Sequence, residues 1–157
     1  MENEQPTRGR LLGLDMGSKT IGLAVSDPLG ITAQGLPTWR RKNLRSDLEA
    51  LQKIIGQYGV VEIVVGYPLH LSGSASAGSE RVAEFADKLR RHFGLPVHLW
   101  DERLTTAQAQ RVLRESEMSI RRRGEVVDRL AAVLILQSFM ECRQAASSDP
   151  NARPECL

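Results

Sequence analysis

The architecture of this chain follows from one short segment, Leu11-Leu12-Gly13-Leu14-Asp15-Met16-Gly17-Ser18-Lys19-Thr20. An apolar strand ends here on the carboxylate of Asp15, a tight turn follows, and a second apolar strand begins at once. Gly17 allows the backbone of the turn to approach a ligand closely. A carboxylate, a hydroxyl and an ammonium group in one turn suit a metal ion and a phosphate, although an ordinary polar hairpin turn would show the same residues.

The composition describes one small, mildly basic domain. The chain has 157 residues, 41% of them hydrophobic, which is enough for a single core. Its net charge is +2, and only four of its 21 basic residues are lysines, so 17 are arginines. Arginine binds phosphate oxygens in pairs, which favours a nucleic-acid partner, but a GC-rich genome would give the same bias.

Several classes of protein are excluded. The polar, acidic N-terminus does not resemble a signal peptide, and no apolar run approaches the ~20 residues of a membrane span. Two cysteines near the C-terminus, Cys142 and Cys156, make neither a disulfide framework nor a CxxC metal site. The histidines, His70, His92 and His98, are too scattered to predict a zinc site. We therefore expect a cytoplasmic protein without a membrane partner.

Three strands in short succession predict an antiparallel meander over Arg10–Met16, Thr20–Ser26 and Ile31–Thr38. Asp27, in the second connection, is interpreted as a turn carboxylate, because Pro and Gly follow it. The spacing of apolar residues then predicts helices and strands in alternation. These are a helix over Asn43–Tyr58 ended by Gly59, a buried parallel strand over Val60–Gly66, a helix over Ser79–Phe93 with Ser79 as N-cap, a strand over Val97–Glu102, a helix from Thr105 or Thr106 to Glu115, a polar and basic loop over 117–124, and a helix over Glu125–Arg143.

This order of elements is the ribonuclease H-like layout. It predicts an α/β fold with a five-stranded mixed sheet, in which three antiparallel strands join two parallel ones and helices cover both faces. Residues 10–143 would form the domain, with a flexible N-terminal tail over 1–9 and a disordered C-terminal tail over 144–157.

Three carboxylates are expected to meet at one edge of this sheet. Asp15 and Glu102 each end a strand, and α/β sites form where parallel strands end. Asp101 is a second candidate from the same strand. Asp128 would come from the last helix, since it shares a face with Ala131, Ala132 and Ile135. A carboxylate on a packed face is costly without a counter-charge, but Asp128 could equally be a first-turn residue that favours the helix dipole.

Oxygen ligands without His or Cys suit Mg²⁺ or Mn²⁺. The chemistry that such ions support is phosphodiester hydrolysis by two metals.

Four motifs resemble one known family, the YqgF/RuvX family of Holliday junction resolvase-like proteins assigned to pre-16S rRNA processing. The resemblance covers residues 10 to 141 and rests on Gly13–Lys19, on Val65–Leu69 with Gly73, on Asp101–Thr106, and on Val127–Ala132 with Ile135–Gln137. It implies a bacterial cytoplasmic nuclease acting at the 5′ end of 16S ribosomal RNA, with Asp15, Glu102 and Asp128 as catalytic metal ligands. The chain departs from the family pattern at His70 and in an Arg-rich insertion over 121–125.

Basic residues near these motifs are candidate substrate contacts. Lys19 and Arg103 could bind the scissile phosphate, or could neutralise the neighbouring carboxylates. Arg121, Arg122 and Arg123 could contact the phosphate backbone, although such runs are often merely solvated. Trp39, which precedes three cations, could stack on an unpaired base or lie half-buried at a strand end.

Other functions fit parts of this pattern. The substrate could be branched DNA rather than precursor RNA, and the oligomeric state stays open. Sugar kinases and actin-like ATPases use the same strand-turn-strand, but they need a second lobe for which 157 residues leave no room. A non-catalytic nucleic-acid-binding regulator would explain the arginines but not three carboxylates at one edge.

Overall fold

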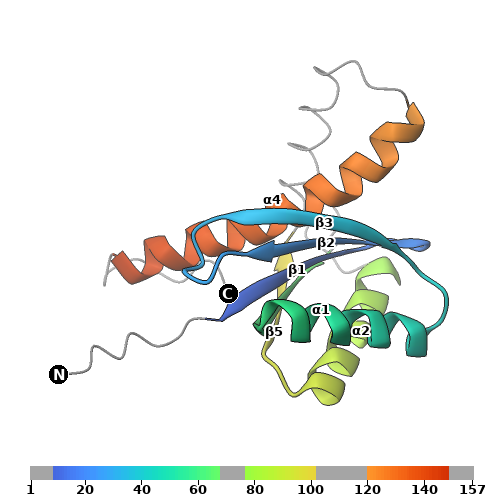
Figure 1. Cartoon of the computed structure of the whole chain (residues 1–157), viewed down its shortest axis with the longest axis horizontal. Helices are drawn as coiled ribbons and strands as arrows, with labels where there is room; N and C mark the ends of the chain where they lie inside the picture. Colours follow the sequence, from blue (N-terminus) through green and yellow to red (C-terminus); the bar gives the residue numbers. More distant parts are fainter. Residues whose placement is uncertain (1–8, 68–76, 102–119, 149–157) are drawn as a thin grey trace.

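The protein is a twisted five-stranded sheet with helices on both faces (Figure 1). The computed structural model describes residues 9–67, 77–101 and 120–148, and in the last range it describes side chains from Arg129 to Ala145. The strand order is β3-β2-β1-β4-β5. The helix predicted from Thr105 or Thr106 to Glu115 lies outside the described residues.

The antiparallel half of the sheet is the predicted meander. Strands β1 (Arg10–Met16) and β2 (Thr20–Ser26) have the predicted bounds, and β2 pairs with both β1 and β3 (Ala33–Arg40). The third strand was predicted two residues too early at each end. Trp39 and Arg40 still pair with β2, which extends the strand.

The β2–β3 turn explains the late start of β3. The amides of Ile31 and Thr32 donate to Oδ1 of Asp27 at 2.7 and 2.9 Å, so both residues belong to the turn. Gly30 adopts a φ of 69°, which favours glycine. Asp27 is therefore a turn carboxylate, as predicted.

The parallel half consists of β4 (Val60–Tyr67) and β5 (Val97–Asp101). Strand β4 pairs in parallel with both β1 and β5. Strand β1 is thus central, flanked by β2 and β4 as predicted. The C-terminal ends of β1, β4 and β5 lie at one edge of the sheet.

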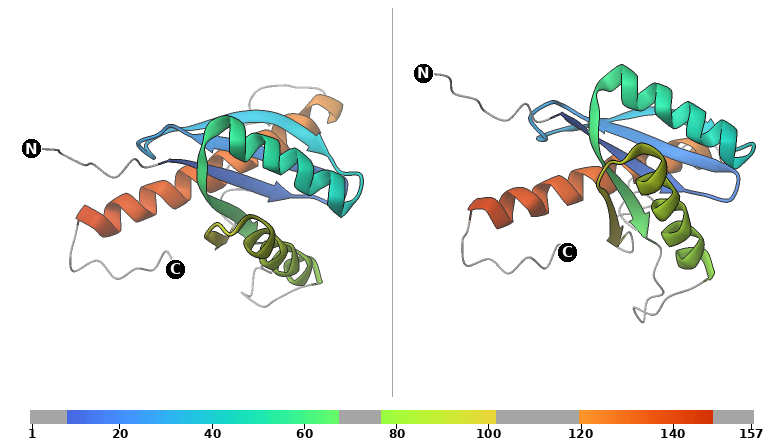
Figure 2. Two further views of the ribbon diagram at one scale, coloured as in Figure 1. Left: turned by 60° about the horizontal axis from the view of Figure 1, so that its bottom comes forward. Right: turned by 90° about the horizontal axis from the view of Figure 1, so that it is seen from below.

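Two helices, α1 (Leu44–Tyr58) and α2 (Ala77–Phe93), cover one face (Figure 2). Asn43 caps α1 by accepting the amide of Ser46, and Gly59 ends it in the left-handed conformation, as expected. The predicted cap of α2 is wrong, because Ser79 is the third residue of that helix and is fully buried.

The other face is covered by α4 (Ile120–Ser148), which extends five residues beyond the prediction at each end. Gly124 costs a helix only about 1 kcal/mol relative to Ala, and the arginines before it are good helix formers. Residues 121–123 consequently lie in the first turn of α4 rather than in a loop. Cys142, near the C-terminal end of α4, is disulfide-bonded.

Each face has its own core. Leu12 and Leu14 pack with the buried side chains of α1 and α2, whereas Leu11 packs with Leu136 and Phe139 of α4. The predicted buried residues Ala131, Ala132 and Ile135 are buried. No helix in the described part of the chain is long and apolar enough to cross a membrane.

Candidate functional site

Asp15 lies at the C-terminal end of the central strand, on the face that α4 covers. Side chains alternate along a strand, and Leu11 faces α4 while Leu12 and Leu14 face the opposite core. Asp15 therefore points to the same side as Leu11 and Gly13. It is half-buried, at the edge where a ligand could reach it.

Glycines lie on both sides of Asp15 in the sheet. Gly22 of β2 is its antiparallel partner. On the other side, Leu14 pairs with Val65, which brings the next residue, Gly66, level with Asp15. The carboxylate is thus the only side chain in its row across β2, β1 and β4. Sequence reasoning did not assign Gly22 to the site, although the hairpin pairing of Met16 with Ile21 fixes its position.

A second row of small residues lies beneath α4. Gly13 pairs with Ala24, and Ala24 pairs with Gly35. A Cβ atom added to Gly13 would lie 2.9 Å from Cβ of Leu136 and 3.1 Å from the carbonyl oxygen of Ala132. At Gly35 it would lie 2.6 Å from Cγ of Arg129. Because these positions lack larger side chains, the helix packs directly against the strands.

This packing places residue 128 near the edge where Asp15 lies. Helix α4 runs opposite to β1 (Figure 1), and Ala132 lies over Gly13. Residue 128 lies about one helical turn before Ala132, which is about 5.4 Å along the helix axis. Asp15 lies two residues after Gly13, about 6.7 Å along the strand in that same direction.

Asp128 is not a first-turn residue. It is the ninth residue of α4, whose first turn contains no acidic side chain. The helix dipole acts only within that first turn, so the dipole explanation for this carboxylate is wrong. The side chain of Asp128 itself lies outside the described part of α4.

The remaining predicted ligand also lies outside the description. Strand β5 ends at Asp101, which is exposed and pairs with Tyr67 of β4. Glu102 and Arg103 follow it in the sequence but are not described. Within the described residues, no group of three His, Cys, Asp or Glu side chains could hold a metal ion. The metal site therefore stays a prediction, with Asp15 as its one described side chain.

The donor chemistry at Asp15 nevertheless fits a hard divalent cation. A carboxylate between glycines of β2 and β4 offers oxygen atoms with no side chain beside them on those two strands. Mg²⁺ and Mn²⁺ prefer such oxygen ligands.

The turn after Asp15 is held by hydrogen bonds. The amide of Gly17 donates to the carbonyl of Thr20 at 2.8 Å, and a Cβ at Gly17 would lie 3.0 Å from that oxygen. Lys19 is exposed and forms no ion pair with the described residues, so it does not neutralise Asp15 through a direct contact.

Arg41 ties this turn to α1, a role that sequence reasoning missed. Its guanidinium donates to the carbonyl of Gly17 at 3.1 Å and to Oδ2 of Asp47 at 3.3 Å. Asp47 is 1% exposed and also accepts the indole N–H of Trp39 at 2.8 Å. Of the two interpretations of Trp39, the structure supports the half-buried residue at a strand end, because its indole N–H donates to Asp47.

Comparisons with known proteins agree with this architecture. The RuvX family model, described as Holliday junction resolvase, matches residues 9–142. A relative from Koribacter versatilis, named "Putative pre-16S rRNA nuclease", is 59% identical over 150 residues, which cover 96% of this chain and 98% of the relative. A relative of the same name from Moorella thermoacetica is 54% identical over 132 residues, 84% of this chain and 94% of the relative.

Solved structures confirm the ribonuclease H-like fold. RuvC of T. thermophilus in complex with a Holliday junction substrate matches with a TM-score of 0.55 and 15% identity, over 86% of this chain and 96% of that one. A fowlpox virus resolvase bound to Holliday junction DNA matches with a TM-score of 0.53 and 12% identity, over 84% and 97%. At such identities these structures show the fold alone.

Proposed function

Since this chain belongs to the RuvX family, we propose that it is a metal-dependent nuclease that processes the 5′ end of the 16S ribosomal RNA precursor. The observation that carries the proposal is the edge at Asp15, where the neighbouring residues on β2 and β4 are glycines. Helix α4 supports it by bringing residue 128 to the same edge. A protein with this substrate would act in the cytoplasm.

In this proposal Asp15, Glu102 and Asp128 hold Mg²⁺ or Mn²⁺. When bound, a pair of such ions activates water and stabilises the leaving oxygen of a phosphodiester. The chain's own contribution is to fix the positions of these carboxylates. Asp15 is fixed by the central strand, and the position of residue 128 is fixed by the packing of α4 on Gly13 and Gly35.

Basic residues around this edge would bind the substrate backbone. We assign that role to Lys19, Arg103, Arg121, Arg122 and Arg123. The exposure of Lys19 beside Asp15 and the helical first turn of α4 support the assignment.

The matching family description favours branched DNA as an alternative substrate. A cleavage assay separates the two possibilities. Labelled precursor RNA that spans the mature 5′ end and a labelled four-way DNA junction are incubated with Mg²⁺, Mn²⁺ or Ca²⁺. We expect RNA cleavage with Mg²⁺ or Mn²⁺ and poor turnover with Ca²⁺, whose looser coordination positions water less strictly.

Metal binding is measured separately by calorimetry without nucleic acid, on the wild type and on Asp15→Asn. Weaker Mn²⁺ binding by a folded Asp15→Asn variant would support the assignment of Asp15. Cleavage that survives exhaustive chelation would refute the metal-dependent mechanism, and preferential cleavage of the junction would refute the RNA substrate.

A further inference from the structure

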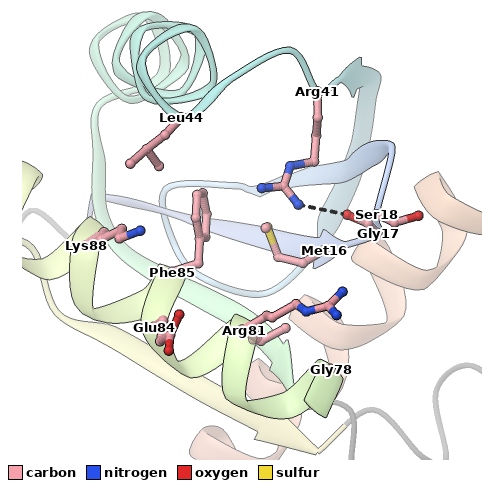
Figure 3. Close-up of a pocket in the computed structure, with 11 residues that line it drawn as sticks. Met16, Gly17, Ser18, Arg41, Leu44, Gly78, Arg81, Glu84, Phe85 and Lys88 are labelled. Atoms are coloured by element: carbon pink, nitrogen blue, oxygen red, sulfur yellow. Dashed lines mark hydrogen bonds between the residues drawn. The ribbon is translucent and has the colours of Figure 1, made fainter.

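A pocket lies on the opposite face of the sheet from the Asp15 carboxylate (Figure 3). It has a volume of about 370 Å³ and forms where the β1–β2 turn, the chain before α1 and the N-terminal half of α2 meet. Met16 lines it and packs toward the α1 and α2 side. Because Met16 directly follows Asp15, the pocket and the carboxylate lie on the two sides of one strand end.

The pocket is predominantly basic. Arg41, Arg81 and Lys88 line it, against one carboxylate, Glu84. Arg81 and Lys88 are exposed and form no ion pair with any residue in the described ranges. Arg41 is fixed in place by Asp47 and by the turn. Two free cations and one fixed cation are suitable donors for the oxygens of a phosphate.

The interior of the pocket is apolar. Figure 3 shows Arg41 and Arg81 on either side of Met16, with the ring of Phe85 beside them. The guanidinium carbon of Arg41 lies 5.8 Å from the centre of that ring. Aromatic rings and guanidinium planes are surfaces on which a nucleobase stacks, and the Met16 side chain adds an apolar wall beside them.

We infer that this pocket binds an unpaired nucleotide of the substrate strand next to the scissile phosphate. The two phosphates that flank this nucleotide lie against Arg81 and Lys88, which are two helical turns apart on α2, and the base lies against Met16 and the plane of Arg41. A base in a duplex is stacked and paired and cannot enter a cavity, whereas an unpaired base can. This inference rests on the proposed function for the position of the scissile phosphate, and it makes single-stranded RNA the preferred ligand.

The test compares two variants that lose equal charge. Arg81→Ala/Lys88→Ala removes the two free cations of the pocket. Lys53→Ala/Arg91→Ala removes one lysine and one arginine from exposed positions of α1 and α2 outside it. Binding of a fluorescent single-stranded RNA oligonucleotide is measured in chelator, so that nothing is cleaved, over a series of salt concentrations. The same oligonucleotide in a perfect duplex is the second probe.

We expect the pocket variant to bind the single strand more weakly, with a log–log salt slope lower by about 1.4, since each phosphate contact on a single strand contributes about 0.7. The matched variant should keep nearly the wild-type slope. Glu84→Gln should bind the single strand more tightly, because it removes the one carboxylate of the pocket. Duplex binding should be similar in the pocket variant and the matched variant.

Equal losses of single-strand binding in the pocket and matched variants would overturn the inference. If wild-type protein then still cleaves RNA, the nuclease proposal stands and only the pocket assignment fails. Conversely, single-strand binding that depends on Arg81 and Lys88 supports the pocket even if the wild type cleaves no RNA.

Discussion

Two carboxylates on the α4 face of the sheet have opposite surroundings. Glu62, near the start of β4, accepts Arg143 at 2.8 Å, and its oxygen lies 3.2 Å from His98 Nε2. Asp15, at the end of β1, has glycines beside it in the sheet. The protein supplies a cation from the C-terminal part of α4 at one end, and brings a further acidic residue, Asp128, to the other. We interpret Glu62 as a structural carboxylate, whereas the proposed function makes Asp15 a metal ligand.

The largest expected difference is in RNA cleavage, between Asp15→Asn and Glu62→Gln. Asp15→Asn should lower RNA cleavage by about 10³-fold or more, because loss of a metal ligand removes several kcal/mol of transition-state stabilisation. Glu62→Gln should cleave near the wild-type rate and lose at most about 1 kcal/mol of stability, since this pair is partly exposed. Single-turnover cleavage and urea unfolding measure the two effects. A folded, fully active Asp15→Asn protein would remove Asp15 from the site.

Asp128→Asn tests whether the second acidic residue belongs with Asp15. In metal-free protein, carboxylates gathered at one edge repel each other. Removal of one charge should therefore leave the thermal midpoint in chelator equal to that of the wild type or higher, while cleavage is lost. A variant that melts lower yet stays active would place Asp128 away from the site.

The arginines in the first turn of α4 should contact nucleic acid more than exposed cations of α1 and α2 do. Replacing Arg121, Arg122 and Arg123 with Ala should weaken RNA binding and lower the log–log salt slope by about 0.7 for each lost phosphate contact. Replacing Arg45, Lys53 and Arg91 with Ala removes the same charge elsewhere. Indistinguishable slopes for the two triple variants would show that the first turn of α4 is solvated surface.

The smallest effect on stability is expected at Asp27, whose carboxylate accepts hydrogen bonds from backbone amides. Burial raises the pKa of its carboxyl, but hydrogen bonds from the amides of Thr32, Ile31 and Leu29 lower it, and the net pKa lies below the usual 3.8. The stabilisation is fully present above the unfolded value and is lost as the pH falls through the folded pKa. The stability advantage over Asp27→Asn should therefore shrink below about pH 4. Urea unfolding from pH 7 to pH 2 measures it, and a difference that is constant with pH would contradict the assignment.

Local signals predicted the parts of the fold that depend on neighbouring residues. The turn at Gly17 sets the bounds of β1 and β2, and Gly59 sets the end of α1. The predicted start of α4 was wrong because Gly124 was interpreted as part of a loop, although one Gly costs a helix only about 1 kcal/mol and the arginines before it are good helix formers.

The candidate site was predictable only in part. The position of Asp15 followed from the strand pattern. The contacts of Arg41 with Gly17 and Asp47 were not predictable, because they join three separate elements. The roles of Glu102 as a metal ligand and of Arg103 as a substrate contact remain predictions from the motif that contains them.

The small residues beneath α4 have a consequence for how variation in this protein is interpreted. Gly13 and Gly35 carry no functional group, yet they determine the thickness of the layer between the strands and the helix. Adding one methyl group at Gly13 would act as a spacer that moves α4 outward and changes the separation between residues 15 and 128. Inactive natural or engineered variants can thus arise at positions with no chemistry of their own, with every catalytic side chain intact but misaligned.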